Sequence, residues 1–128
     1  MAANRCAARR KFGFVTAIYK ICPASLWREA ERAGKFRGSE HDRRDGFIHF
    51  STPEQAAETA AKHFASQRDL VLLQVDAARL GAHLKWEPSR GGALFPHLYG
   101  DLDLAAVTKI HPLPLGPDGK HEFPPLGP

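Results

Sequence analysis

The chain has few cysteines and no long apolar run, and these two absences exclude several classes of protein. Its 128 residues include only Cys6 and Cys22, too few for the disulfide framework of a small secreted domain. The longest apolar runs, such as residues 70–73, are far shorter than the roughly 20 residues that a membrane-spanning helix needs. The basic N-terminus is not followed by the cleavage pattern of a secretory signal. We therefore expect a cytoplasmic protein with reduced thiols.

The usual sequence signatures of phosphate loops and metal sites are also missing. No segment of the form G-x-G-x-x-G or G-x-x-x-x-G-K occurs. The seven histidines include no pair at i, i+2 or i, i+4, and the cysteines lie apart from them. The sequence therefore predicts no zinc site and no other metal site.

Positive charge is concentrated at the N-terminus. The net charge of +4 equals the contribution of Arg5, Arg9, Arg10 and Lys11, which lie in the first 11 residues without any acidic residue. The rest of the chain is therefore neutral. Nucleic-acid binding needs cations on the folded surface, so the neutral body argues against a nucleic-acid partner, although the basic tail keeps an RNA-associated role as a third hypothesis.

The length and composition fit one domain with two distinct ends. Hydrophobic residues make up 43% and charged residues 25% of the chain, as in ordinary globular proteins. Six of the ten prolines follow residue 111, where the missing amide donors prevent regular ladders. We expect a disordered basic tail over residues 1–11, a single α+β domain over 12–113, and a proline-rich extended tail over 114–128.

Apolar patterns predict five strands and two helices. A helix between Pro23 and Gly34 has apolar residues at helical spacing. A second helix begins at a capping box of the form S-x-x-E over residues 51–54 and ends near Ser66. The charge-rich segment 34–45 is expected to be a solvated loop, and 88–101 a packed or functional loop. The expected strands cover residues 16–22, 46–50, 70–75, 83–87 and 107–111.

This order of elements favours an α+β fold with the two helices packed on one side of a mixed sheet. The apolar run 70–75 shows no helical period, so we expect it to be the central strand, covered on both faces. In the 83–87 strand, alternation places Leu84 and Trp86 on the buried face and Glu87 on the polar face.

Two groups of residues are candidates for chemistry. On the 46–50 strand, His49 and Ser51 share a face, where the imidazole would suit proton transfer or ligand binding. The structural alternatives are a packed histidine and a serine that only caps the next helix.

The second group surrounds the segment 88–101. Glu87 ends a strand, where it would orient a ribose or form a surface ion pair with Lys85. Arg90, His97 and Tyr99 offer a cation, an imidazole and an aromatic hydroxyl, as nucleotide sites do, or they belong to a loop that is simply packed.

Several blocks of the chain, between about residues 16 and 113, resemble family 952 of the domains of unknown function. The most specific are Phe-Ile-His-Phe-Ser over 47–51 and Phe-Pro-His-Leu-Tyr-Gly over 95–100. Further blocks are residues 18–21, 26–27, 45–52, 72–76 and 84–87.

More distantly, these blocks are similar to the ADP-ribosyltransferase-like superfamily, including the tRNA 2′-phosphotransferases. The resemblance implies two small sheets around a cleft that holds NAD or an ADP-ribosyl group. It places residues 19–22 at the first motif and 47–51 at the second. The first-motif histidine of that superfamily is Lys20 here, which can donate hydrogen bonds but lacks an acceptor nitrogen.

Two hypotheses follow from this resemblance and the residues. The first is a nucleotide- or NAD-binding enzyme that transfers an ADP-ribosyl or phosphoryl-ribose group, in which Glu87 steadies the positive charge on ribose. The second is a non-catalytic module on the same fold that binds a small ligand or a partner. The sequence leaves the substrate, the acceptor and the oligomeric state open. The candidate site consists of His49 and Glu87 as catalytic residues and of Lys20, Ser51, Arg90, His97 and Tyr99 as ligand-binding residues.

Overall fold

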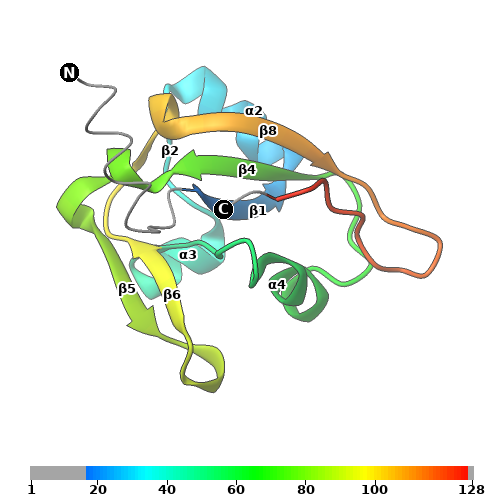
Figure 1. The fold of residues 1–128 in the computed structure, drawn as a ribbon. Helices are drawn as coiled ribbons and strands as arrows, with labels where there is room; N and C mark the ends of the chain where they lie inside the picture. Colours follow the sequence, from blue (N-terminus) through cyan, green and yellow to red (C-terminus); the bar gives the residue numbers. More distant parts are fainter. Residues whose placement is uncertain (1–16, 127–128) are drawn as a thin grey trace, which may run out of the picture.

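The computed structural model describes residues 17–126, which form an α+β fold of small antiparallel sheets and three α-helices (Figure 1). The basic tail expected over residues 1–11 lies outside the described residues. The helices are α2 (Ala24–Ala33), α3 (Glu40–Asp45) and α4 (Ala56–His63). None of the helices in this part of the chain is long and apolar enough to cross a membrane.

The largest sheet contains β1 (Ala17–Pro23), β4 (Leu70–Asp76) and β8 (Val107–Leu113) in the order β1-β4-β8. Both pairings are antiparallel. The expectation that the apolar run 70–75 forms the central strand is confirmed. Successive residues of β4 point to opposite faces, so Leu72 enters one hydrophobic cluster and Leu73 the other.

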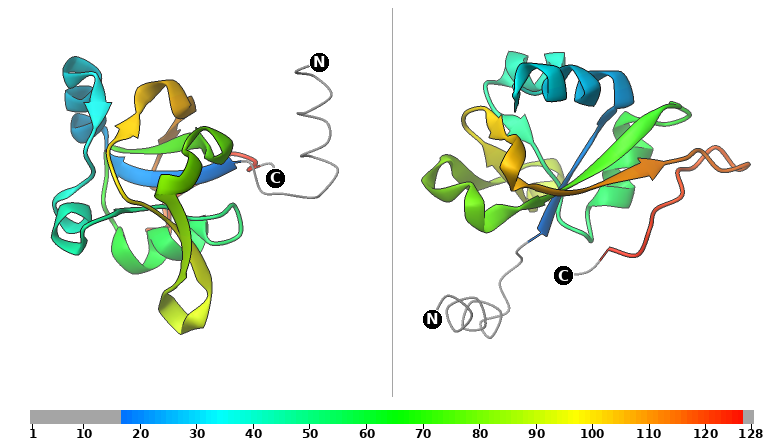
Figure 2. Two further views of the ribbon diagram at one scale, coloured as in Figure 1. Left: turned by 90° about the vertical axis from the view of Figure 1, so that its left-hand side faces the viewer. Right: turned by 90° about the horizontal axis from the view of Figure 1, so that it is seen from above.

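The two longer helices cover opposite faces of this sheet (Figure 2). Trp27 of α2 packs in the cluster of Leu73, whereas Ala60 of α4 packs in the cluster of Leu72 and Tyr19. The expectation of a mixed sheet is wrong, because the strand pairings are antiparallel. The expectation of two helices on one side is also wrong. The physical reason is that β4 is apolar on both faces and needs a cover on each.

The remaining strands form two smaller sheets. One pairs β2 (Lys35–Phe36) with β7 (Leu102–Asp103), and the other has the order β3-β6-β5. Its strands are β3 (Ile48–His49), β6 (Leu94–Leu98) and β5 (Leu84–Pro88).

The expected strand over 46–50 is thus shorter, and the expected loop 88–101 contains the hairpin strand β6. Ser51 and Tyr19 exchange two backbone hydrogen bonds of 2.8 Å, which connect β3 to the first sheet.

The segment expected to be a solvated loop contains α3. Ser39 accepts a hydrogen bond from the Asp42 amide, and the Asp42 carboxylate accepts one from the Ser39 amide, which is a reciprocal capping box. Gly46 ends the helix with a φ of 89°.

The box expected over 51–54 is wrong: Thr52 and Gln55 exchange these bonds instead, just before α4 begins. Ser51 lies too far back to cap α4, since its backbone pairs with Tyr19.

Gly38 precedes α3 and has a φ of 94°, and a Cβ at this position would lie 2.8 Å from the Asp42 Cβ. We expect Gly38→Ala to destabilise the protein by roughly 1–2 kcal/mol for the left-handed backbone and by a further 1–3 kcal/mol for overpacking. Gly34→Ala is the matched control, because Gly34 has a φ of 85° and open space around it. Urea unfolding measures both, and equal losses would contradict the close packing against Asp42.

Candidate functional site

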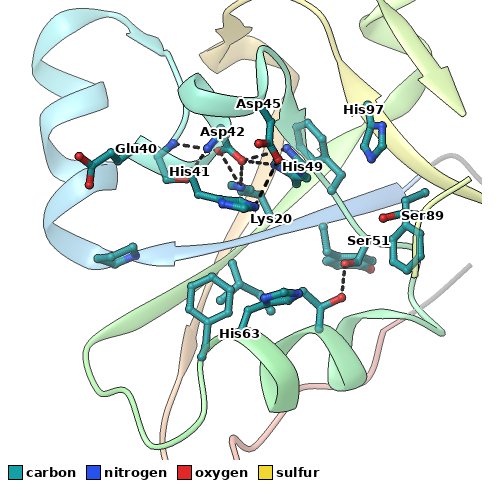
Figure 3. Close-up of a pocket in the computed structure, with 18 residues that line it drawn as sticks. Lys20, Glu40, His41, Asp42, Asp45, His49, Ser51, His63, Ser89 and His97 are labelled. Atoms are coloured by element: carbon teal, nitrogen blue, oxygen red, sulfur yellow. Dashed lines mark hydrogen bonds and ion pairs between the residues drawn. The ribbon is translucent and has the colours of Figure 1, made fainter. Parts of the chain in front are cut away.

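A cavity of about 540 Å³ lies where β1, α3, β3, α4 and β6 meet (Figure 3). Four of the residues expected from sequence line it together: Lys20, His49, Ser51 and His97. They come from three strands and the turn after β3, so the fold brings together positions that are up to 77 residues apart in the chain. The cavity also receives side chains that no sequence pattern suggested, chiefly from α3.

Lys20 and Asp42 form a buried ion pair beneath the cavity. The Lys20 Nζ lies 2.7 Å from Asp42 Oδ2 and 3.0 Å from Oδ1, and the two side chains are 7% and 0% exposed. Lys20 points from β1 toward α3, so its ammonium neutralises a carboxylate rather than standing open to a ligand. The expected role of Lys20 in holding a phosphate or ribose oxygen has to compete with this contact.

Asp42 also receives hydrogen bonds from three other donors. Its Oδ1 lies 2.6 Å from His49 Nδ1 and 3.2 Å from the His49 amide, and its Oδ2 lies 2.9 Å from the Ser39 amide. Burial by itself raises the pKa of this carboxyl. The bond from His49, the charge and bond of Lys20 and the Ser39 amide outweigh burial, so the pKa of Asp42 lies well below its ordinary value. Asp42 is therefore a fixed negative charge.

His49 is held at both ring nitrogens. Nδ1 faces the buried Asp42, and Nε2 lies 2.9 Å from Asp45 Oδ2. The ring stacks on His41 with a centroid distance of 4.7 Å, and its side chain is 28% exposed. The neighbours Ile48 and Phe50 are each 2% exposed in the core, so strand alternation directs His49 to the cavity.

A second imidazole–carboxylate pair lies on β6 and β5. The His97 Nδ1 is 2.7 Å from Glu87 Oε1, and the Tyr99 hydroxyl donates to the same oxygen at 2.8 Å. These two hydrogen bonds lower the pKa of Glu87, and the bond to Glu87 raises the pKa of Tyr99. Phe47 stacks on His97 at 4.1 Å between centroids. The His97 ring is thus fixed on two sides.

Of the other residues expected in the site, some line the cavity and others lie outside its lining. Ser51 is buried, and its hydroxyl shares a 2.8 Å hydrogen bond with that of Thr59 on α4. Glu87 and Tyr99 are not among the described residues that line the cavity, and Glu87 reaches it only through His97. The Arg90 side chain lies outside the described residues.

The expected orientation of β5 is also wrong in part. Trp86 is 40% exposed, because β5 is the edge strand of its sheet and its apolar face is incompletely covered.

Sequence patterns do not identify three residues of the site, His41, Asp42 and Asp45. They lie in the charge-rich segment that was expected to be a loop. The capping-box form S-x-x-D over residues 39–42 was the available signal, because it predicts a helix there and places His41 and Asp45 one turn apart.

The lining of the cavity is acidic. Among its described residues, the three carboxylates of Glu40, Asp42 and Asp45 face a single ammonium, that of Lys20. Four histidines also line the cavity: His41, His49, His63 and His97. Such a cavity favours a cationic or neutral ligand over an anion.

Comparison with known proteins places these features in a family context. A family model described as "Protein of unknown function (DUF952)" matches residues 21–110. The crystal structure of protein CC0527 from Caulobacter crescentus is similar, with 53% identity and a TM-score of 0.81 over 84% of this chain and 94% of that chain. Its solution NMR structure gives 54% identity and a TM-score of 0.74 over 81% and 90%. No curated protein matches the chain. The more distant likeness to the ADP-ribosyltransferase-like superfamily stays a prediction.

We expect Lys20→Met to destabilise the protein by about 3–5 kcal/mol, because it leaves the buried Asp42 carboxylate without its counter-ion. Lys35→Met is the matched control. Lys35 pairs with Asp101 at 3.5 Å with both side chains nearly half exposed, so its loss costs roughly 0–1 kcal/mol. Urea denaturation measures both free energies of unfolding, and losses of similar size would contradict the central role of the buried pair.

The chain has two tyrosines, which allows a direct test of the Tyr99–Glu87 contact. Burial raises the pKa of Tyr19, and the Glu87 hydrogen bond raises that of Tyr99. Glu87→Gln removes the negative charge that opposes the phenolate, so we expect the pKa of Tyr99 to fall while Tyr19 is unchanged. Ultraviolet titration of tyrosinate measures both, and Glu54→Gln, which removes an exposed carboxylate elsewhere, controls for net charge. An unchanged titration in Glu87→Gln would contradict the contact.

Proposed function

The chain belongs to the family of proteins of unknown function DUF952, and on that premise we propose that it is an enzyme acting on the ribosyl part of a nucleotide such as NAD. His97 is the group that transfers a proton in this proposal. The observation that carries it is the 2.7 Å contact between Glu87 and His97 Nδ1, on the wall of the cavity.

The carboxylate determines which nitrogen of His97 is available. A carboxylate only accepts hydrogen bonds, so Nδ1 carries the proton and Nε2 is left as the acceptor. The stacking of Phe47 holds the ring plane, as a general base requires. Glu87 is thus a positioning residue that acts through His97, rather than a group that touches the ribose itself.

The charge of the lining suits this chemistry. The nicotinamide–ribose part of NAD is cationic, and the ribose carries positive charge while the bond from its anomeric carbon to nicotinamide breaks. The nicotinamide nitrogen takes the bonding electrons. The hydroxyl of an acceptor, water or an alcohol, forms the new bond to the anomeric carbon, and His97 accepts its proton. Carboxylates placed nearby stabilise such a cationic transition state. A diphosphate, in contrast, needs cations, and Lys20 is the only lysine or arginine among the described residues that line the cavity. Its ammonium is already paired with Asp42.

The size and walls of the cavity also fit a nucleoside. Its volume of about 540 Å³ lies within the range of small-molecule sites, roughly 300–1,000 Å³. Aromatic rings on different elements supply flat apolar surface for a base: Tyr19 on β1, Phe64 at the end of α4 and Phe95 on β6.

A non-catalytic binding module is the second candidate. The observation that favours it is the Lys20–Asp42 pair, because the resemblance to the ADP-ribosyltransferase-like superfamily implies a histidine at position 20, and here a paired lysine stands there. In this reading the cavity binds the same ligand without breaking a bond.

Titrations with nicotinamide riboside and with its reduced form separate the effect of ligand charge from that of ligand size. The two forms have the same size, but the ring of the reduced form is uncharged. We expect the cationic form to bind roughly five- to tenfold more tightly, since a charge pair near 4 Å is worth about 1 kcal/mol even in water. Calorimetry gives the affinities, and amide shifts should locate binding at the cavity. Absence of shifts there at millimolar ligand would rule out the proposed substrate class.

Turnover distinguishes the two candidate functions. For an enzyme, we expect release of nicotinamide from the bound riboside or from NAD, reduced about 10²- to 10⁴-fold in His97→Gln with binding retained. His83→Gln, which changes an exposed histidine outside the cavity lining, should leave the rate unchanged. Binding without any release of nicotinamide would instead support the non-catalytic module. Chromatography of the products provides the measurement.

A further inference from the structure

Two imidazoles and a carboxylate converge at the rim of the cavity. His41 and Asp45 lie one turn apart on α3, and His49 approaches them from β3 (Figure 3). One ligand atom from each of the three residues lies within 4.8 Å of the other two. Asp45 Oδ2 is 2.9 Å from His49 Nε2 and 3.5 Å from His41 Nε2. We propose that His41, Asp45 and His49 bind a divalent cation of the zinc class.

The support behind His49 is the arrangement that metal-binding histidines have. Its second nitrogen, Nδ1, lies 2.6 Å from Asp42, a carboxylate that is 0% exposed and fixed by Lys20 and the Ser39 amide. A histidine ligand almost always donates its other N–H to such a carboxylate or to a carbonyl, which orients the ring. In this protein a buried ion pair supplies that support, and His49 presents Nε2 to the rim.

The contact between His49 Nε2 and Asp45 Oδ2 already brings two potential metal ligands to within 2.9 Å of each other. A cation at the rim would bind both atoms, because an imidazole nitrogen and a carboxylate oxygen can each donate a lone pair to it.

The donor set indicates which cation fits. Two nitrogens and one carboxylate oxygen are typical of zinc and similar first-row metals, whereas Mg²⁺ and Ca²⁺ prefer oxygen ligands alone. Tetrahedral zinc with ligands at 2.0–2.1 Å needs ligand atoms about 3.3 Å apart. The His41 and Asp45 side chains are exposed, so they have room to rotate toward this spacing. His63 of α4 lies on the same cavity, with its ring centroid 6.5 Å from that of His41, where it could complete the coordination.

Arg44 opposes the binding of a cation. Its guanidinium lies 2.9 Å from His41 Nδ1, so it occupies one nitrogen of that ring and places a positive charge beside the site. Arg44 is exposed and can turn away, but its contact and its charge should both weaken the site. Arg44→Gln is therefore expected to strengthen metal binding.

Calorimetry of the full chain with zinc chloride, after removal of metal by a chelator, tests this inference. We expect one zinc per chain with a dissociation constant at or below the micromolar range. His41→Gln and Asp45→Asn should each weaken it at least tenfold, and Arg44→Gln should tighten it. The exposed His83 lies outside the cluster, so His83→Gln should have no effect.

Cobalt gives an independent readout, since tetrahedral Co²⁺ with nitrogen ligands has intense visible absorption that should disappear in Asp45→Asn. The His41 and Asp45 side chains are exposed, so their substitution should leave the fold intact, and circular dichroism verifies this. Weak zinc binding that all four variants share equally, or no binding at tens of micromolar zinc, would overturn the inference. The test uses no nucleotide, so its failure leaves the proposed function standing, and a failed riboside titration of the metal-free protein leaves the metal site standing.

Discussion

A lysine and an aspartate that are buried together hold in place the elements that surround the cavity. Transfer of each charge out of water costs several kcal/mol, so such a pair persists only where the remaining hydrogen-bonding capacity is satisfied. Here both oxygens of Asp42 receive hydrogen bonds, from Lys20, from His49 and from the Ser39 amide. The contact fixes α3 against β1, and the position of His49 follows from it. One charge pair therefore links the cap of a helix, the core of a sheet and the wall of the cavity.

The elements that the sequence predicts well are those whose signals are complete within the segment. Pro23 and Gly34 bracket α2, and the continuous apolar run of 70–75 marks the central strand. The failures occur where a distant partner decides the outcome. The strand expected over 46–50 keeps only Ile48–His49 in its ladder, because Ser51 pairs with Tyr19 of another sheet. The helix α3 has a local capping-box signal, but its buried aspartate also needs a counter-ion, which Lys20 supplies from 22 residues away.

The same distinction applies to the candidate site. Strand alternation suffices to direct His49 away from the core, since Ile48 and Phe50 are both buried. No local pattern, however, indicates that Asp42 stands behind this imidazole or that Glu87 acts through His97. Both relations depend on the packing of separate elements, which periodicity does not encode. Family resemblance pointed to segments of β1, β3 and β6 that line the cavity, but it did not indicate Asp42, the carboxylate that orients His49.

The two tryptophans occupy contrasting environments, and the molecule thereby contains two optical probes. Trp27 is 6% exposed in the core beneath α2, whereas Trp86 is 40% exposed on the β5–β6 hairpin, one residue before Glu87. A hydrated indole emits at longer wavelength than a buried one and is accessible to soluble quenchers. Fluorescence therefore distinguishes changes in the surroundings of the hairpin that carries His97 from exposure of the core. No foreign label is needed to follow either one.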